Sequence, residues 1–263
     1  MSIESGLLSG VLARTPQTDV HDGQPRYAVL VASEPAEIRA AQRLRHQVFA
    51  GEMGARLHSA VAGVDSDDLD AYCDHLIVRD DHTGAVIGTY RMLPPHRAAQ
   101  AGRLYSDGEF ELDALAELRP SLVEVGRSCV HPDHRNGAVI NLMWSGIARY
   151  MLLTGHRWLA GCASVPLADG GATAASVWEY VQNKHLAPAE YRVAPRHPWR
   201  VPDARPASRA ALPPLLRGYL RLGAWVCGEP AYDPDFGVID LFVLLAMDRV
   251  DGRYLRHFLG DMP

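Results

Sequence analysis

The stretch that decides the fold is EVGRSCVHPDHRNG, residues 124–137. An acid and a base, Glu124 and Arg127, lie inside the apolar run LVEVGRSCV, which is typical of a strand. A short basic loop then opens a segment with helical spacing of apolar residues. This order indicates either a catalytic strand that leads into an anion-binding turn, or an ordinary strand with an ion pair and a turn.

Glu124 and Arg127 would point to opposite faces of a regular strand, because side chains alternate. A β-bulge around Gly126 would bring both to one face, since the extra residue resets the alternation. An exposed edge strand with an ion pair is the alternative. The flanking leucine, valines and cysteine favour a buried strand.

The loop HPDHRNG precedes an expected helix over residues 138–154. Backbone N–H groups at a helix N-terminus bind anions, and Arg135 would add positive charge. The loop has only one glycine, Gly137, so a simple turn explains it equally well.

The rest of the chain predicts an α/β (α+β) domain with a mixed, strongly twisted β-sheet and flanking helices. We expect strands at 26–32, 74–93 (a hairpin), 120–132, 157–165 and 238–248, helices from 35 to 49, 138–154, 173–185 and 215–223, and a long loop at 194–214. Residues 1–25 are expected to form a flexible N-terminal arm, and residues 26–263 a single domain.

The composition excludes several classes of protein. Of 263 residues, 48% are hydrophobic, the net charge is −5, and no basic block suggests nucleic acid as a partner. No secretory signal is evident, and the longest apolar run, VIDLFVLLAM, is too short to span a bilayer. The four cysteines form no C-x-x-C pair. We therefore expect a cytoplasmic protein with reduced thiols.

Two arginines have unusual positions. Arg45 lies on the apolar face of its expected helix, one turn before Phe49, and Arg91 lies near the end of a hairpin strand. Each guanidinium must reach water or an acid. The acidic segment that contains Asp67 and Asp70 could supply those acids. It departs from a calcium loop in its third ligand and its glycine, so no metal is expected.

These motifs together resemble one branch of the GNAT (acetyltransferase-like) superfamily. The motifs are RHQVF (45–49), D-x-x-D-x-Y-C-D-H-L (67–76), GTYRMLP (88–94), EVGRSCVHPDHR (124–135) and PAYDPDFGVIDLFVLL (230–245). The branch is the ornithine N-acyltransferases of ornithine-lipid biosynthesis, which is similar to the acyl-homoserine-lactone synthases. The CDHL stretch and the PAYDPDFG ending favour the ornithine-lipid branch.

The resemblance implies a GNAT-like acyl-N-acyltransferase fold with a bulged central strand. It also implies direct transfer of a β-hydroxy fatty acyl group from acyl carrier protein to the α-amine of ornithine. Glu124 would be the base and Arg127 its catalytic neighbour. The implied substrate-binding residues are Arg45, Phe49, Asp67, Asp70, His75 and Arg91. The implied acyl-donor-binding residues are Cys129, Val130, Arg135, Asn136 and Gly137.

The donor loop departs from members of the superfamily that use acetyl-CoA. Those carry R/Q-x-x-G-x-G/A, whose glycines let backbone amides surround a pyrophosphate, whereas RNGAV (135–139) does not fit this spacing. A carrier-protein donor presents phosphopantetheine with a single phosphate. The loop therefore suits acyl carrier protein better than acyl-CoA, and no other cofactor is expected.

Two alternative functions remain, one with a different acceptor substrate and one that is not an enzyme. The first is a long-chain N-acyl amino acid or acyl-homoserine-lactone synthase. The second is a non-catalytic GNAT-like binding module, which would have no need of a base in the sheet. The sequence leaves open a peripheral contact with the inner face of the membrane, where a lipid product would go.

Overall fold

A computed structural model describes residues 10–15, 26–200 and 211–259. The chain divides into two compact units. Unit 1 contains residues 1–92, 126–156 and 252–263, and unit 2 contains residues 93–125 and 157–251. Strand β6 (Leu122–Val130) contributes its first part to unit 2 and its second part to unit 1. The two units are described separately.

Unit 1 is built on a twisted sheet. Strands β1 (Val11–Arg14), β2 (Tyr27–Val31), β3 (Asp74–Asp80) and β4 (Val86–Leu93) pair antiparallel in this order. The second part of β6 follows β4 in the sheet. Asp80 accepts hydrogen bonds in the β3–β4 turn, and Gly84 has φ +75° there. This local chemistry closes the predicted hairpin.

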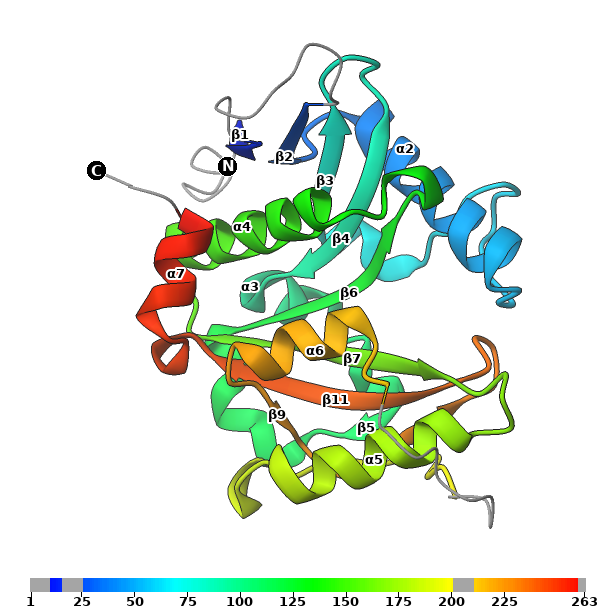
Figure 1. Cartoon of the computed structure of the whole chain (residues 1–263), viewed down its shortest axis with the longest axis vertical. Helices are drawn as coiled ribbons and strands as arrows, with labels where there is room; N and C mark the ends of the chain where they lie inside the picture. The colour runs from blue at the N-terminus through cyan, green and yellow to red at the C-terminus, as the bar shows by residue number, and fades with distance from the viewer. Residues whose placement is uncertain (1–9, 16–25, 201–210, 260–263) are drawn as a thin grey trace. The chain divides into compact units, whose positions relative to one another are not determined.

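Helices cover this sheet (Figure 1). Helix α2 (Pro35–His46) begins with a capping box between Glu34 and Glu37 and continues as the π-helix η2 (Gln47–Glu52). Helix α4 (Gly137–Thr154) is capped at its N-terminus by Asn136 and at its C-terminus by Gly155, whose left-handed backbone favours glycine. It contacts β1, β2 and β3, and helix α7 (Gly252–Leu259) packs against it.

Unit 2 has the parallel pair that makes the sheet mixed. The first part of β6 runs parallel to β7 (Trp158–Pro166), which pairs antiparallel with β11 (Val238–Ala246) over nine residues. Strands β10 (Ala231–Asp233) and β9 (Trp225–Val226) pair with β11. Gly161 in β7 allows a close approach, because a Cβ there would lie 2.2 Å from the carbonyl oxygen of Val125.

The remaining elements of unit 2 surround these strands (Figure 1). The helices are α3 (Pro95–Ala101), α5 (Ala172–Lys184) and α6 (Pro214–Arg221). Strands β5 (Phe110–Glu111) and β8 (Ala194–Pro195) form a separate pair. Short 3-10 helices of unit 2 are η4 (Ser106–Gly108), η5 (Asp113–Ser121), η7 (Ala189–Tyr191) and η8 (Met247–Arg249). Two more, η3 (Asp68–Tyr72) and η6 (Pro132–His134), belong to unit 1.

The mixed sheet with flanking helices confirms the predicted fold class. The N-terminal arm needs a correction, because residues 11–14 form a strand that pairs with β2. Residues 1–9 and 16–25 of that arm lie outside the described residues, as do residues 201–210 of the predicted long loop. Residues 194–195 of the loop form β8, since their backbone pairs with β5.

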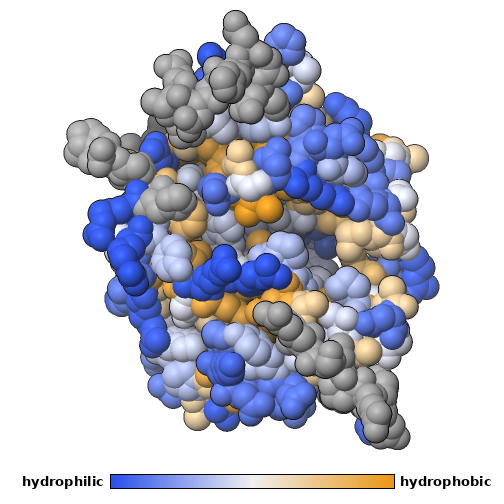
Figure 2. Space-filling model, in the orientation of Figure 1, coloured by the Kyte–Doolittle hydropathy of each residue, from blue (hydrophilic) through white to orange (hydrophobic). Residues whose placement is uncertain are grey.

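No helix among the described residues has both the length and the apolar character needed to cross a bilayer. Polar residues dominate the face drawn in Figure 2, with smaller apolar areas between them.

Candidate functional site

The predicted acid–arginine pairs are present in unit 1. Arg45 is fully buried, and its Nη2 lies 2.7 Å from Asp70 Oδ2. Its Nε lies 2.8 Å from Asp65 Oδ2, and Nη2 also donates to the Asp65 carbonyl oxygen. Burial would raise the pKa of Asp70, but the charge and hydrogen bonds of Arg45 outweigh it and lower that pKa. Asp65 joins the network although the sequence interpretation did not assign it a role.

Arg91 and Arg127 extend this network from two strands. Arg91 Nη1 lies 2.6 Å from Asp67 Oδ1 and 3.5 Å from Asp70 Oδ1. Arg127 Nε lies 3.3 Å from Asp65 Oδ2, and its Nη2 lies 3.6 Å from Asp67 Oδ2. Three arginines from α2, β4 and β6 therefore converge on the acidic segment before β3.

Arg127 is the only described non-glycine residue with positive φ, at +52°. A strand residue in this conformation is strained, and such strain is concentrated at functional sites. The sequence predicted a β-bulge around Gly126, and the structure has a positive φ at the neighbouring Arg127. The ion pairs with Asp65 and Asp67 hold this side chain in place.

His75 and Phe49 are both buried beside the network. His75 Nε2 lies 3.2 Å from the carbonyl oxygen of Asp70, and burial lowers the pKa of this imidazole. Phe49 is 6% exposed within η2. In this conformation both side chains face protein interior.

Glu124 belongs to unit 2, where its carboxylate holds a loop. Its Oε2 accepts from the N–H of Tyr105 at 2.6 Å, and its Oε1 accepts from the N–H of Ser106 at 2.8 Å. The residue is 4% exposed. A carboxylate oxygen can accept more than one hydrogen bond, so a proton-accepting role is compatible with these bonds.

The predicted donor-binding residues lie along the β6–α4 connection of unit 1. Asn136 Oδ1 accepts from the N–H of Val139, while Gly137 begins the helix. Arg135 forms a bidentate pair with Glu52, at 2.5 and 2.6 Å. Cys129 and Val130 end the strand, and burial raises the pKa of the Cys129 thiol to about 12. That thiol is therefore a poor nucleophile.

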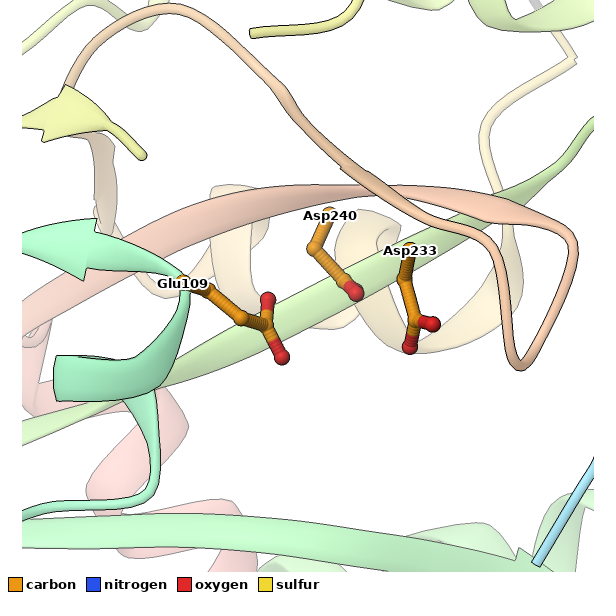
Figure 3. Close-up of side chains that lie close together, drawn as sticks. All are labelled: Glu109, Asp233 and Asp240. Atoms are coloured by element: carbon orange, nitrogen blue, oxygen red, sulfur yellow. The ribbon is translucent and has the colours of Figure 1, made fainter. Parts of the chain in front are cut away.

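Unit 2 contains an acidic cluster that the sequence interpretation missed. Glu109, Asp233 and Asp240 offer ligand atoms that all lie within 4.8 Å of one another. Figure 3 shows the three carboxylates pointing into a shared space. Asp240 is 3% exposed in the otherwise apolar strand β11, and Ser164 donates to its Oδ1 at 2.6 Å.

The charges within this acidic cluster oppose one another. Burial, together with the neighbouring Asp240 and Asp233, raises the pKa of Glu109 to about 8. Glu109 therefore holds its proton near neutral pH, because ionisation would add a third negative charge. Such a cluster is suited chemically to a hard cation or to an organic ammonium group.

The sequence carried a partial signal for this cluster. Asp233 and Asp240 both lie in the quoted segment PAYDPDFGVIDLFVLL, and the β10–β11 pairing places Asp240 opposite Ala231. Glu109 precedes β5, more than a hundred residues earlier, and no local pattern connects it to the other two.

Comparison with known sequences identifies close relatives. The acetyltransferase (GNAT) domain family matches residues 44–145. An L-ornithine N(alpha)-acyltransferase of Rhodobacter capsulatus is 36% identical over 233 residues, which is 83% of this chain and 89% of the relative. One of Brucella abortus is 34% identical over 248 residues, which is 88% of each chain.

Comparison with solved structures supports the same fold. The CoA-dependent acyl-homoserine lactone synthase BjaI superposes with a TM-score of 0.51 at 16% sequence identity. The alignment covers 87% of this chain and 84% of BjaI. At this identity the likeness concerns the fold alone.

Proposed function

Since this chain belongs to the family of the L-ornithine N(alpha)-acyltransferases and is an acyltransferase with a GNAT fold, we propose that it acylates the α-amine of ornithine. The product would be an N-acyl amino acid, the first intermediate of an ornithine lipid. The names of the relatives support ornithine as the acceptor, and their similarity extends over most of the chain.

The observation that carries this proposal is the acidic cluster of Glu109, Asp233 and Asp240. Ornithine has a side-chain ammonium group besides its α-ammonium and carboxylate. Three carboxylates around one space match such a cation by charge. Neutral amino acids lack this second cation, so the cluster favours a diamino acid over them.

The proposed donor is a β-hydroxy fatty acyl thioester of acyl carrier protein. The loop before α4 has one glycine, and the charge of Arg135 is already paired with Glu52. Both features leave less capacity for the pyrophosphate of CoA than a glycine-rich loop offers. The single phosphodiester of carrier-bound phosphopantetheine needs fewer hydrogen-bond donors and less positive charge.

The proposed reaction is direct. Glu124 takes a proton from the α-ammonium, through a water if needed, and the amine nitrogen attacks the thioester carbonyl carbon. The tetrahedral oxyanion is stabilised by backbone N–H groups near Cys129 and Val130. The C–S bond then breaks, the nitrogen gives up its second proton as the amide forms, and the departing thiolate takes up that proton.

We also propose that the acid–arginine network shapes the part of the site that binds the acceptor. The network consists of Arg45, Asp67, Asp70, Arg91 and Arg127, with Phe49 and His75 beside it. Its contacts support a rigid, preorganised element rather than a mobile one.

A matched pair of variants tests the acceptor. Asp233→Asn keeps an oxygen that can accept from the N–H groups of Asp235 and Phe236, but it removes one charge from the acidic cluster. We expect its KM for ornithine to rise about tenfold, since losing one charge partner costs roughly 1–2 kcal/mol. Asp235→Asn is the control, because Asp235 lies in the same turn outside the cluster.

Product formation is measured by mass spectrometry with purified acyl carrier protein thioester and ornithine. If both variants have the same KM for ornithine, the acidic cluster does not bind the acceptor. Acylation of homoserine lactone or of neutral amino acids in preference to ornithine would overturn the proposed acceptor.

A further inference from the structure

The turn between β6 and α4 carries an ion pair with fixed geometry. Arg135 Nη1 and Nη2 lie 2.5 and 2.6 Å from the two carboxylate oxygens of Glu52, and Arg135 Nε donates to the Val130 carbonyl oxygen at 3.1 Å. The hydrogen bonds from Arg135 lower the pKa of Glu52. The carboxylate is therefore ionised at neutral pH, and it cancels the charge of Arg135.

Glu52 is held in this position from both ends of its element. It is the last residue of η2, and the first residue, Gln47, contacts His131 of the same turn, with Nε2 of each side chain 3.2 Å apart. Two contacts thus join η2 to the β6–α4 turn. A π-helix of this kind is often retained at functional sites.

The N-terminus of α4 retains little capacity for anions. Asn136 caps the N–H of Val139 with its side chain, and its carbonyl oxygen accepts from Ile140. The N–H groups of Gly137 and Ala138 are the first two of the helix and have no acceptor within it. Two backbone donors, beside an arginine whose charge is neutralised by Glu52, are better suited to a ligand with one phosphate than to a ligand with three.

We propose that Glu52 selects the acyl donor by charge. Its carboxylate opposes CoA, which carries a pyrophosphate and a 3′-phosphate, and tolerates a carrier-bound phosphopantetheine with one phosphodiester. This inference rests on the proposed function, in which the donor phosphate lies near the start of α4. It makes Glu52 a specificity-determining residue that takes no part in the chemical step.

The test uses Glu52→Gln, which removes the charge and keeps the side-chain shape. The kcat/KM is measured with one acyl group presented on CoA and on acyl carrier protein. We expect a rise of about tenfold with acyl-CoA and of less than about threefold with acyl carrier protein, because repulsion grows with the number of ligand charges. Asp81→Asn is the control, since Asp81 is another exposed acid paired with an arginine, Arg14.

A second variant separates charge from folding. Glu52→Gln combined with Arg135→Gln returns the local net charge to that of the wild type, so the preference for the carrier protein should return. Titration calorimetry with CoA alone gives a readout that does not require turnover. We expect tighter CoA binding by Glu52→Gln than by the wild type.

Two results would overturn the inference. They are an unchanged ratio of the two kcat/KM values in Glu52→Gln, or a ratio that the double variant fails to restore. If the wild type acylates ornithine while the ratio stays unchanged, the proposed function stands and only the role of Glu52 fails. If the wild type uses neither donor, the proposed function fails first.

Discussion

At the scale of single residues, Glu109 shows how burial changes the task of a carboxylate. Its pKa is raised to about 8 because burial and two neighbouring aspartates oppose its ionisation. Below pH 8 the acidic cluster is mostly one negative charge short, and above pH 8 it has all three. The charge that a cationic acceptor meets therefore depends on pH within the physiological range.

The first prediction concerns the pH dependence of acceptor binding. We expect the KM for ornithine to fall as the pH rises from 6 to about 8.5, because Glu109 loses its proton and attracts the ammonium group more strongly. In Glu109→Gln this dependence should disappear. Steady-state kinetics across this pH range provide the measurement, and an unchanged profile in the variant would contradict the assignment.

Stability provides an independent check on the same residue. The folded-state pKa lies above the unfolded value of about 4.3, so the folded protein loses stability as the pH rises from 4 through 8. Glu109→Gln should therefore raise the melting temperature at pH 8.5 and change it little at pH 4. Differential scanning calorimetry at the two pH values measures this difference.

The second prediction concerns Glu124. Replacing a general base should lower kcat by a factor on the order of 10²–10⁴, so Glu124→Gln should lose most activity. The glutamine amide would also face the N–H of Tyr105 or Ser106, costing about 1–3 kcal/mol of stability. Rapid single-turnover assays on the folded variant separate these effects, and a rate within a few-fold of wild type would exclude the base role.

At the scale of elements, the β6–β7 pair depends on one glycine. A Cβ at Gly161 would lie 2.2 Å from the Val125 carbonyl oxygen, far inside a normal contact. The parallel pairing of these strands joins Leu122–Glu124 to Trp158–Ala160. Gly161 lies directly after the last of these pairs.

The third prediction follows from this contact. Gly161→Ala should force the two backbones apart and destabilise the protein by about 1–3 kcal/mol or more, with loss of activity. Gly108→Ala is the control, because a Cβ there meets no atom within 4 Å. Urea unfolding gives the free energy of unfolding of both variants. If the two values are equal, the strands can move apart without loss of stability.

The elements also show which features a sequence can reveal. Arg45 on an apolar helix face had to reach water or an acid, and the segment with Asp67 and Asp70 was the candidate source of that acid. The structure pairs Arg45 with Asp70. The positive φ of Arg127 could not be predicted, because no residue preference places a non-glycine there. The π-helical end of the predicted helix 35–49 likewise has no sequence signal.

At the scale of the whole molecule, contacts between residues far apart in the sequence explain why the acidic cluster was not predicted. The acidic cluster joins a residue before β5 to two residues on β10 and β11. Its members become neighbours only when unit 2 folds, so periodicity and spacing could not reveal it. Motif order along the chain nevertheless predicted the GNAT fold, because that order reflects the sequence of elements.

The fourth prediction concerns the product made by the whole protein. Expression in a host that lacks amino-acid lipids should yield new N-acyl ornithine species, detectable by mass spectrometry of total lipids. Asp233→Asn should lower their amount and Asp235→Asn should not. Diffusible acyl lactones in place of ornithine amides would overturn the proposed acceptor.

The buried thiols of this chain have a practical consequence for following its folding. Burial raises the pKa of Cys129 and of Cys227 to about 12, and no disulfide links the four cysteines. Alkylating reagents attack thiolates, so the native protein should resist iodoacetamide at neutral pH. The alkylation rate of each cysteine would then report local unfolding of the segment that contains it. Peptide mapping would measure the four rates separately.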